Sequence, residues 1–229
     1  MDNNKQIKIY KHYDVVMAAF VTILLCTNLI GASKVTTVLG YEFGAGTLFF
    51  PISYLFGDIL TEVYGYANSR KVIWIGFIAM IFASVMSLVI INMPSASSWT
   101  DQKAFETVFG TTWRITVGSL FAFWVGEFMN SFVLAKLKIK TSGKKLWLRF
   151  ILSTVVGQGI DTLIFYPVAF YGIWQTPLLL TVMTHDYFLK IVWEIIAIPL
   201  TYLIINFLKR SEQEDYYDYN TNFNPFSNK

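Results

Sequence analysis

Cysteine and charged residues are both scarce in this chain of 229 residues. Its single cysteine, Cys26, excludes an internal disulfide. Only 14% of the residues are charged and the mean hydropathy is +0.49, whereas soluble proteins have about 25% charged residues. The sequence also lacks a Gly-rich phosphate-binding loop, which argues against ATP hydrolysis by this chain itself. The composition leaves no room for a second, soluble domain and indicates an integral membrane protein.

Long apolar stretches make up most of the sequence. A helix needs about 20 apolar residues to cross the hydrocarbon core of a bilayer. We therefore predict an all-α integral membrane protein, a bundle of six transmembrane helices over residues 1–210 with a disordered cytoplasmic tail over 211–229. The amphipathic segment 94–111 is predicted to form a helix on the outer surface. The six membrane helices are expected near 14–33, 43–63, 72–93, 112–135, 147–172 and 184–208.

Lysine and arginine are distributed unevenly between the two sides of this predicted bundle. If the N-terminus is cytoplasmic, every loop lysine and arginine except Lys34 and Lys103 falls on the cytoplasmic side. Such a bias orients membrane proteins and predicts that both termini are cytoplasmic. The net charge of +3 comes from these loops, so it is not evidence for a nucleic-acid partner. The first apolar stretch is too long for a typical signal peptide and is interpreted as an uncleaved helix.

The six predicted spans can be divided into two structurally repeated halves. Two halves of three helices would have opposite orientation, which is the plan of transporters whose binding site lies at the midplane between the halves. Gly57 and Asp58 in the second stretch have counterparts in Gly157 and Asp161 of the fifth. A 3+3 inverted repeat is therefore a hypothesis that the sequence leaves open.

Ionisable residues interrupt the apolar stretches. Each costs about 2.5–3.5 kcal/mol on insertion scales, so such residues usually serve a function or pair with another charge. Asp58, Glu127 and Asp161 are the strongest functional candidates, because no basic residue lies within one helical turn of any of them. We expect these carboxylates to converge on a polar chamber inside the bundle.

Structural interpretations compete for several other polar residues. Lys190 is placed to form an ion pair with Glu194 on its own helix, and Arg114 is placed to snorkel at a helix end. Glu62 is placed to contact Arg70 or Lys71, which follow it closely in the sequence. The amides Asn28, Gln158 and Asn130 are of the type that joins membrane helices by hydrogen bonds.

A chamber of this kind suits a planar, nitrogen-rich ring. A carboxylate can accept two N–H donors from a guanine-like edge, and aromatic side chains offer flat stacking surfaces. The chemistry permits a heterocyclic substrate without specifying one.

Short motifs throughout residues 14–208 resemble the queuosine precursor transporter family, a vitamin-uptake-like group of bacterial membrane proteins. Gly57, Asp58 and Thr61, followed by Arg70 and Lys71, are similar to the second helix of that family. Further resemblances, in the other helices, are carried by Thr27, Asn28, Arg114, Ser119, Gly126, Ser153, Thr154, Gly157, Gln158, Asp161, Thr162, Phe165, Tyr187, Lys190 and Pro199.

The resemblance implies import of 7-deazaguanines across the bacterial cytoplasmic membrane for tRNA modification, without a bound cofactor or metal. The substrates would be the cyano or aminomethyl precursors or queuine. In relatives we expect an amide where Glu127 stands and a carboxylate where Asn130 stands. The resemblance assigns substrate or gating roles to Asn28, Asp58, Arg114, Gln158, Asp161 and Lys190.

The sequence also leaves alternatives for the function and for the oligomeric state. One alternative is a substrate-binding membrane subunit of an energy-coupling-factor importer, which needs a separate ATPase. An intramembrane aspartyl protease is disfavoured, because Ile160 separates Asp161 from Gly159 and turns the carboxylate by about 100° around the helix. A homodimer is left open, since small transporters often dimerise but no Gly-xxx-Gly pair in a predicted helix argues for one.

Overall fold

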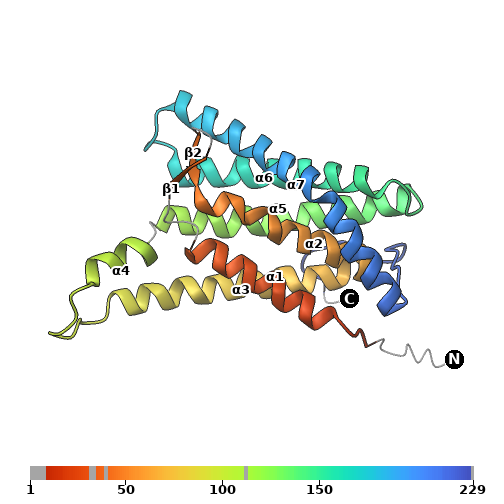
Figure 1. Cartoon of the computed structure of the whole chain (residues 1–229), viewed down its shortest axis with the longest axis horizontal. Coiled ribbons are helices and arrows are strands. Elements are labelled where there is room, and N and C mark those ends of the chain that lie inside the picture. Colours follow the sequence, from red (N-terminus) through yellow and green to blue (C-terminus); the bar gives the residue numbers. More distant parts are fainter. Residues whose placement is uncertain (1–8, 31–34, 39–40, 111–112, 228–229) are drawn as a thin grey trace.

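A computed structural model describes residues 9–30, 35–38, 41–110 and 113–227 of the chain. These residues form a helical bundle with one small hairpin at one end (Figure 1). In chain order the elements are α1 (Tyr13–Ile30), β1 (Val35–Val38), β2 (Tyr41–Gly44), the 3-10 helix η1 (Ala45–Leu48), α2 (Phe50–Tyr64), α3 (Tyr66–Ile91), α4 (Gln102–Phe109), α5 (Trp113–Lys140), α6 (Leu146–Phe170) and α7 (Thr176–Glu212).

Four segments are long and apolar enough to cross a membrane. They are α3, the segment Gln102–Lys140 that includes α5, α6 and α7, while α1 is a shorter apolar helix. This confirms a largely helical, multi-pass membrane protein. The count of six spans, the inverted repeat and the cytoplasmic termini stay predictions.

The second apolar stretch is only partly helical, which differs from the predicted span of 43–63. Residues 41–44 pair with 35–38 in an antiparallel hairpin, and α2 begins only at Phe50. Pro51 occupies the first turn of α2, where its missing N–H costs no hydrogen bond. With 15 residues, α2 is about 22 Å long. Twelve of those residues are buried, so α2 is an interior helix enclosed by its neighbours.

The connection between α2 and α3 is also shorter than predicted. A single residue, Gly65, separates the two helices, and α3 begins at Tyr66 instead of near 72. Gly65 has φ +82, a left-handed conformation that a residue without Cβ adopts readily. A Cβ at this position would overlap the ring of Tyr216. The chain therefore reverses direction here with the C-terminal tail packed directly on the turn.

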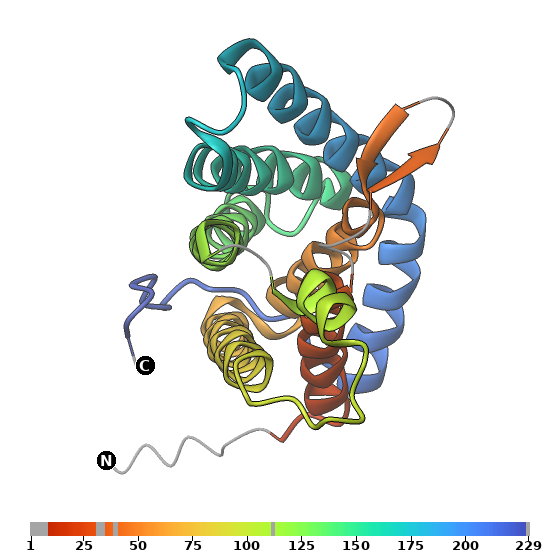
Figure 2. The same ribbon diagram turned by 90° about the vertical axis from the view of Figure 1, so that its left-hand side faces the viewer.

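Helices α5 and α6 lie side by side in the bundle (Figures 1 and 2). The two helices approach each other closely at Gly126 and Gly157, where a Cβ added to either glycine would lie 3.0 Å from the other's carbonyl oxygen. Small residues permit such close contact between membrane helices. Because α2 packs against both α5 and α7, polar residues of four helices can meet in the interior.

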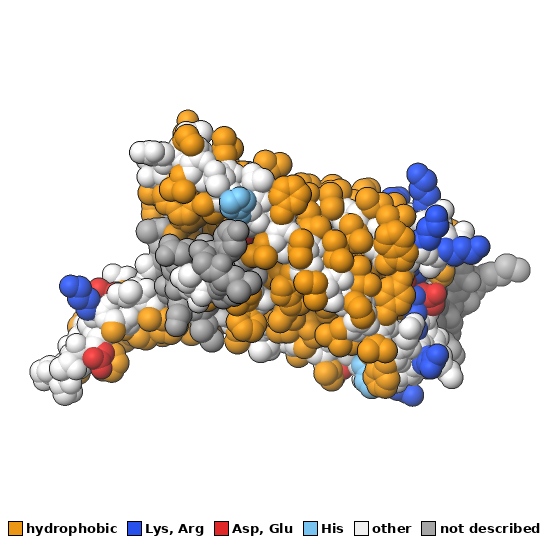
Figure 3. All heavy atoms as spheres, turned by 45° about the horizontal axis from the view of Figure 1, so that its top comes forward, with side chains coloured by type: hydrophobic (Ala, Val, Ile, Leu, Met, Phe, Trp, Pro, Cys, Tyr) orange, Lys and Arg blue, Asp and Glu red, His pale blue; other side chains and the backbone are white. Residues whose placement is uncertain are grey.

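The surface has an apolar band and a basic end. In the face shown in Figure 3, hydrophobic side chains cover the middle of the bundle and most Lys and Arg side chains gather at one end. That is the end of the α5–α6 connection, whereas α4 lies at the opposite end (Figure 1). Exposed hydrophobic residues of the candidate membrane spans include Ile78, Phe82, Leu163, Ile196 and Leu203. This distribution is the one expected of a protein surrounded by lipid.

The described part of the C-terminal tail is ordered against the bundle, and the prediction of disorder is wrong for residues 213–227. The Asp218 carboxylate accepts from the backbone N–H of Tyr66 at the start of α3. Arg70 donates to the carbonyl oxygens of Asn222 and Asn224 at 2.7 and 2.8 Å. The sequence of the tail lacks periodicity because its contacts are made by single residues rather than by a helix face.

Candidate functional site

Seven polar residues from four helices are buried in the middle of the bundle. Each is at most 6% exposed. Five of them are site residues predicted from the sequence. The other two are an amide on α5 and a carboxylate on α7. We refer to these seven as the interior cluster: Asp58, Glu127, Asn130, Gln158, Asp161, Lys190 and Glu194.

Asp58 is held by a neighbouring helix. Asn130 on α5 donates from Nδ2 to Asp58 Oδ1 at 2.7 Å. Within the described part of the chain, Asp58 Oδ2 and Asn130 Oδ1 are buried without a hydrogen-bond partner. Asp58 thus keeps one oriented oxygen for another donor.

Glu127 occupies space that a glycine provides. A Cβ added to Gly57 on α2 would overlap the Glu127 carboxylate. Both oxygens of Glu127 and both oxygens of Glu194 lack a hydrogen-bond partner among the described residues. Glu127 is close enough to Asp161 and Glu194 for electrostatic interaction, and Asp58 is likewise close to Glu194 and Glu127. The carboxylates therefore face one shared region, as expected from the sequence.

Lys190 pairs with two aspartates and not, within the described structure, with Glu194 on its own helix. Its Nζ lies 3.1 Å from Asp161 Oδ2 on α6 and 3.0 Å from Asp186 Oδ2 one turn earlier on α7. It also lies 5.0 Å from the centroid of the Phe50 ring. Asp161 therefore has a counter-charge after all, supplied by another helix, whereas Glu194 is left without one among the residues described.

Unpartnered polar atoms are concentrated at this site. Besides the carboxylate oxygens, the described structure leaves Tyr54 Oη, Thr154 Oγ1, Gln158 Oε1 and Thr162 Oγ1 buried without a partner. A buried polar group that lacks its hydrogen bond costs about 1–3 kcal/mol. So many of them in one place indicate a site completed by a bound molecule or by water. The atoms are also sealed from solvent, so access requires movement of the helices.

Two predicted site residues lie apart from the interior cluster. Asn28 on α1 accepts from Ser119 Oγ on α5 at 2.7 Å and donates to its own helix. Arg114 donates to the carbonyl oxygens of Val168 and Tyr171 at the end of α6. These contacts join helices, and a role in substrate binding stays a prediction for both residues.

Other contributors were not selected from the sequence. From the sequence, Glu194 is assigned a role only as a partner for Lys190, and Asp186 and Tyr54 are assigned none. Asp186 precedes Lys190 by four residues and Tyr54 precedes Asp58 by four, so helical spacing places each pair on one face. That spacing was the available signal.

A second charged group, around the buried Glu62, contrasts with the interior cluster because its carboxylates are all paired. Glu62 contacts Arg149 at 2.7 Å, Lys209 at 2.6 Å and Lys138 at 3.4 Å. Asp215 of the tail pairs with both lysines. The partners of Glu62 are thus residues of α5, α6 and α7, and the suggested contact with Arg70 or Lys71 is wrong. We call this group the paired network.

Comparison with known proteins identifies the family. Residues 44–204 match the family described as "Putative vitamin uptake transporter". The chain belongs to this family. It is 31% identical over 190 residues to a "Probable queuosine precursor transporter" of Bacillus subtilis (strain 168), covering 82% of both chains. It is 28% identical over 141 residues to the "Queuosine precursor transporter" of Escherichia coli (strain K12), covering 62% of this chain and 60% of that one. No solved structure matches the chain significantly.

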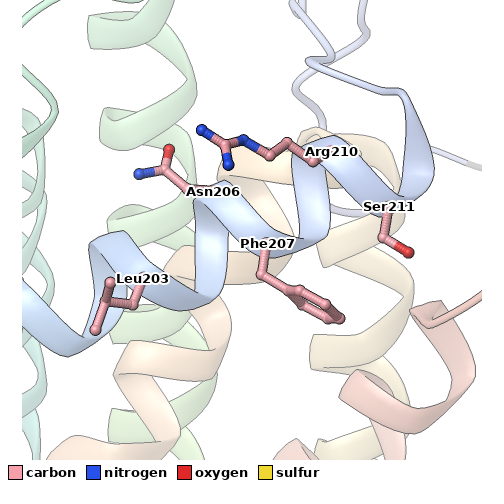
Figure 4. Close-up of a pocket in the computed structure, with 5 residues that line it drawn as sticks. All are labelled: Leu203, Asn206, Phe207, Arg210 and Ser211. Carbon is pink, nitrogen blue, oxygen red and sulfur yellow. The ribbon is translucent and has the colours of Figure 1, made fainter.

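The resemblance inferred from the short motifs is therefore confirmed, and the fold can be interpreted as that of a vitamin-uptake-type transporter. A pocket on the surface of α7, shown in Figure 4, is formed by Leu203, Asn206, Phe207, Arg210 and Ser211. Leu203 and Phe207 are largely exposed, so this surface faces the surroundings of the bundle. The interior cluster is the better candidate for a transported substrate.

Proposed function

We propose that this protein imports queuosine precursors across the bacterial cytoplasmic membrane for use in tRNA modification. The substrates would be 7-deazaguanines, namely the cyano or aminomethyl precursors or queuine. The observation that carries the proposal is the interior cluster, whose unpartnered buried oxygens come from four helices. The names of the relatives point to the same class of substrate.

The donors and acceptors of the cluster suit a guanine-like edge. Such an edge presents adjacent N–H donors, which a carboxylate can accept in pairs, together with a carbonyl oxygen that needs a donor. Gln158 and Tyr54 offer both functions, and Phe50 lies beside Lys190 as an aromatic surface. The ring would thus be bound among α2, α5, α6 and α7.

The proposed mechanism is alternating access. Two groups of three helices would rock against each other around a site near the midplane, opening the cluster first to one side and then to the other. The sealed cluster would correspond to an occluded state between the two open ones. The paired network at the end of α2 would hold the helices together on the side of the basic residues.

The test is uptake by the purified protein in proteoliposomes, with the cyano, aminomethyl and queuine compounds as substrates and guanine as the control. Asp161→Asn should abolish uptake, because the variant removes the charge that holds Lys190 from α6. Glu106→Gln, on the exposed helix α4, is the matched control and should transport normally. Retained uptake by Asp161→Asn would remove Asp161 from the site.

The same assay addresses the alternative function. If the purified protein binds a 7-deazaguanine but accumulates none in proteoliposomes, it would act as the substrate-binding subunit of an ATP-driven importer. Uptake by the protein alone would exclude that requirement. Neither binding nor uptake of any 7-deazaguanine would overturn the proposed function.

A further inference from the structure

The interior cluster holds more negative than positive charge. Together with Asp186, it contains the five carboxylates of Asp58, Glu127, Asp161, Asp186 and Glu194. Against these stands Lys190, which bridges Asp161 and Asp186 at 3.1 and 3.0 Å. Three carboxylates, those of Asp58, Glu127 and Glu194, therefore have no cationic partner within the described residues.

Nearby cations of the protein are committed elsewhere. Arg149, Lys138 and Lys209 all contact Glu62, which lies one turn after Asp58 on α2. Lys138 and Lys209 are further held by Asp215 of the tail. No flexible lysine or arginine in the described structure is thus placed to neutralise the three carboxylates without breaking the paired network.

The unpartnered atoms themselves point to a ligand rich in hydrogen-bond donors. Asp58 Oδ2 and the four carboxylate oxygens of Glu127 and Glu194 are buried without partners in the described part of the chain, and all five are acceptors. Tyr54, whose side chain is fully buried, also has an unpartnered hydroxyl and is close to Asp58 and Glu127. Its hydroxyl lies 2.7 Å from where a Cβ on Gly126 would be.

An organic cation fits these acceptors better than a metal ion. No group of three or more His, Cys, Asp or Glu side chains with the geometry to hold a metal occurs among the residues described. An ammonium group carries three N–H donors and a positive charge. Hydrogen bonds between an ammonium and carboxylates are the stronger, charge-assisted kind.

We infer that this transporter selects a cationic substrate, and that Asp58, Glu127 and Glu194 receive a protonated amine on the 7-deazaguanine. The inference rests on the proposed function and specifies its substrate: the aminomethyl compound is favoured over the neutral cyano compound. The ring edge is then left to Gln158, Asn130 and Tyr54, whose polar atoms are also buried without a partner in the described structure.

The experiment compares three ligands that share one ring system. Competition for uptake is measured in proteoliposomes at neutral pH with the aminomethyl, the cyano and a neutral hydroxymethyl 7-deazaguanine. The aminomethyl compound is expected to compete about 10- to 100-fold better than the hydroxymethyl compound, which matches it in size but lacks the charge. Glu194→Gln should reduce this ratio to within a few-fold of one.

Glu106→Gln on α4 should leave the ratio unchanged. The ratio measured with the wild-type protein tests the inference without depending on the folding of any variant. Equal competition by the aminomethyl and hydroxymethyl compounds would overturn the inference and leave the proposed function intact. A ratio unchanged by both Glu194→Gln and Asp58→Asn would also overturn it. Transport of none of the compounds would overturn both proposals.

Discussion

Replacing Glu62 by glutamine should destabilise the bundle strongly. Glu62 has no exposed surface and contacts Arg149 at 2.7 Å and Lys209 at 2.6 Å, with Lys138 at 3.4 Å. Glutamine has a similar shape but removes the charge that three cations share. Removing one partner of a buried ion pair costs about 3–5 kcal/mol, because the remaining charge stays buried without compensation. For a chain of this size the loss corresponds to a fall in Tm on the order of 10 °C.

The assay is thermal unfolding in detergent. Unfolding is measured as the loss of protein that elutes as a single species in size-exclusion chromatography. The double variant Glu62→Gln with Arg149→Gln removes one charge of each sign, so it should lose less stability than the sum of the two single variants. Glu106→Gln is the control for loss of an exposed carboxylate. A Tm for Glu62→Gln within about 2 °C of wild type would refute the reasoning that these contacts are buried and unscreened.

Two further predictions concern a glycine and a tail residue. Gly57→Ala places a methyl group on the Glu127 carboxylate, so uptake should fall at least about tenfold, whereas Gly159→Ala on α6 meets only Tyr187 at 3.7 Å and should be tolerated. Partial burial opposes ionisation of Asp215, but hydrogen bonds from Lys138 and Lys209 outweigh it and hold its pKa below the usual 3.8. The unfolded chain binds that proton more readily, so the contribution of Asp215 is present above about pH 4 and is lost as the pH falls through the lowered pKa. Asp215→Asn should therefore lower Tm at pH 7, and a difference that persists undiminished at the lowest pH the protein tolerates would contradict the assignment.

Helical spacing predicted more of the interior than of the ends. The absence of a basic residue within one turn made Asp58 and Glu127 functional candidates, and the structure shows both buried with carboxylate oxygens that lack a partner among the described residues. The same reasoning missed the pairing of Asp161, because Lys190 is 29 residues away in the chain and reaches it from another helix. Spacing along one helix carries no information about a charge on its neighbour.

The ends depended on single contacts that leave no pattern. Residues 213–227 were expected to be disordered, yet Asp218 meets the start of α3 and Trp74 donates to the carbonyl oxygen of Pro225 at 2.9 Å. Residues 43 and 44, which belong to the predicted second span, instead lie in the hairpin of 35–38 and 41–44. Apolar β-branched and aromatic residues suit a strand as well as a membrane helix.

Short motifs in the sequence carried the resemblance to the transporter family. The sequence by itself also determined that the chain is a multi-pass helical membrane protein, and that carboxylates would be buried within it. Hydrophobic length and the cost of charge in lipid suffice for that, since both act on each segment separately. Only the tertiary structure decided which carboxylates are neutralised. Glu62 and Asp161 are paired by cations from distant segments, while Asp58, Glu127 and Glu194 converge without one among the described residues. Ion pairing between helices depends on distances of a few ångströms that only the packed bundle fixes.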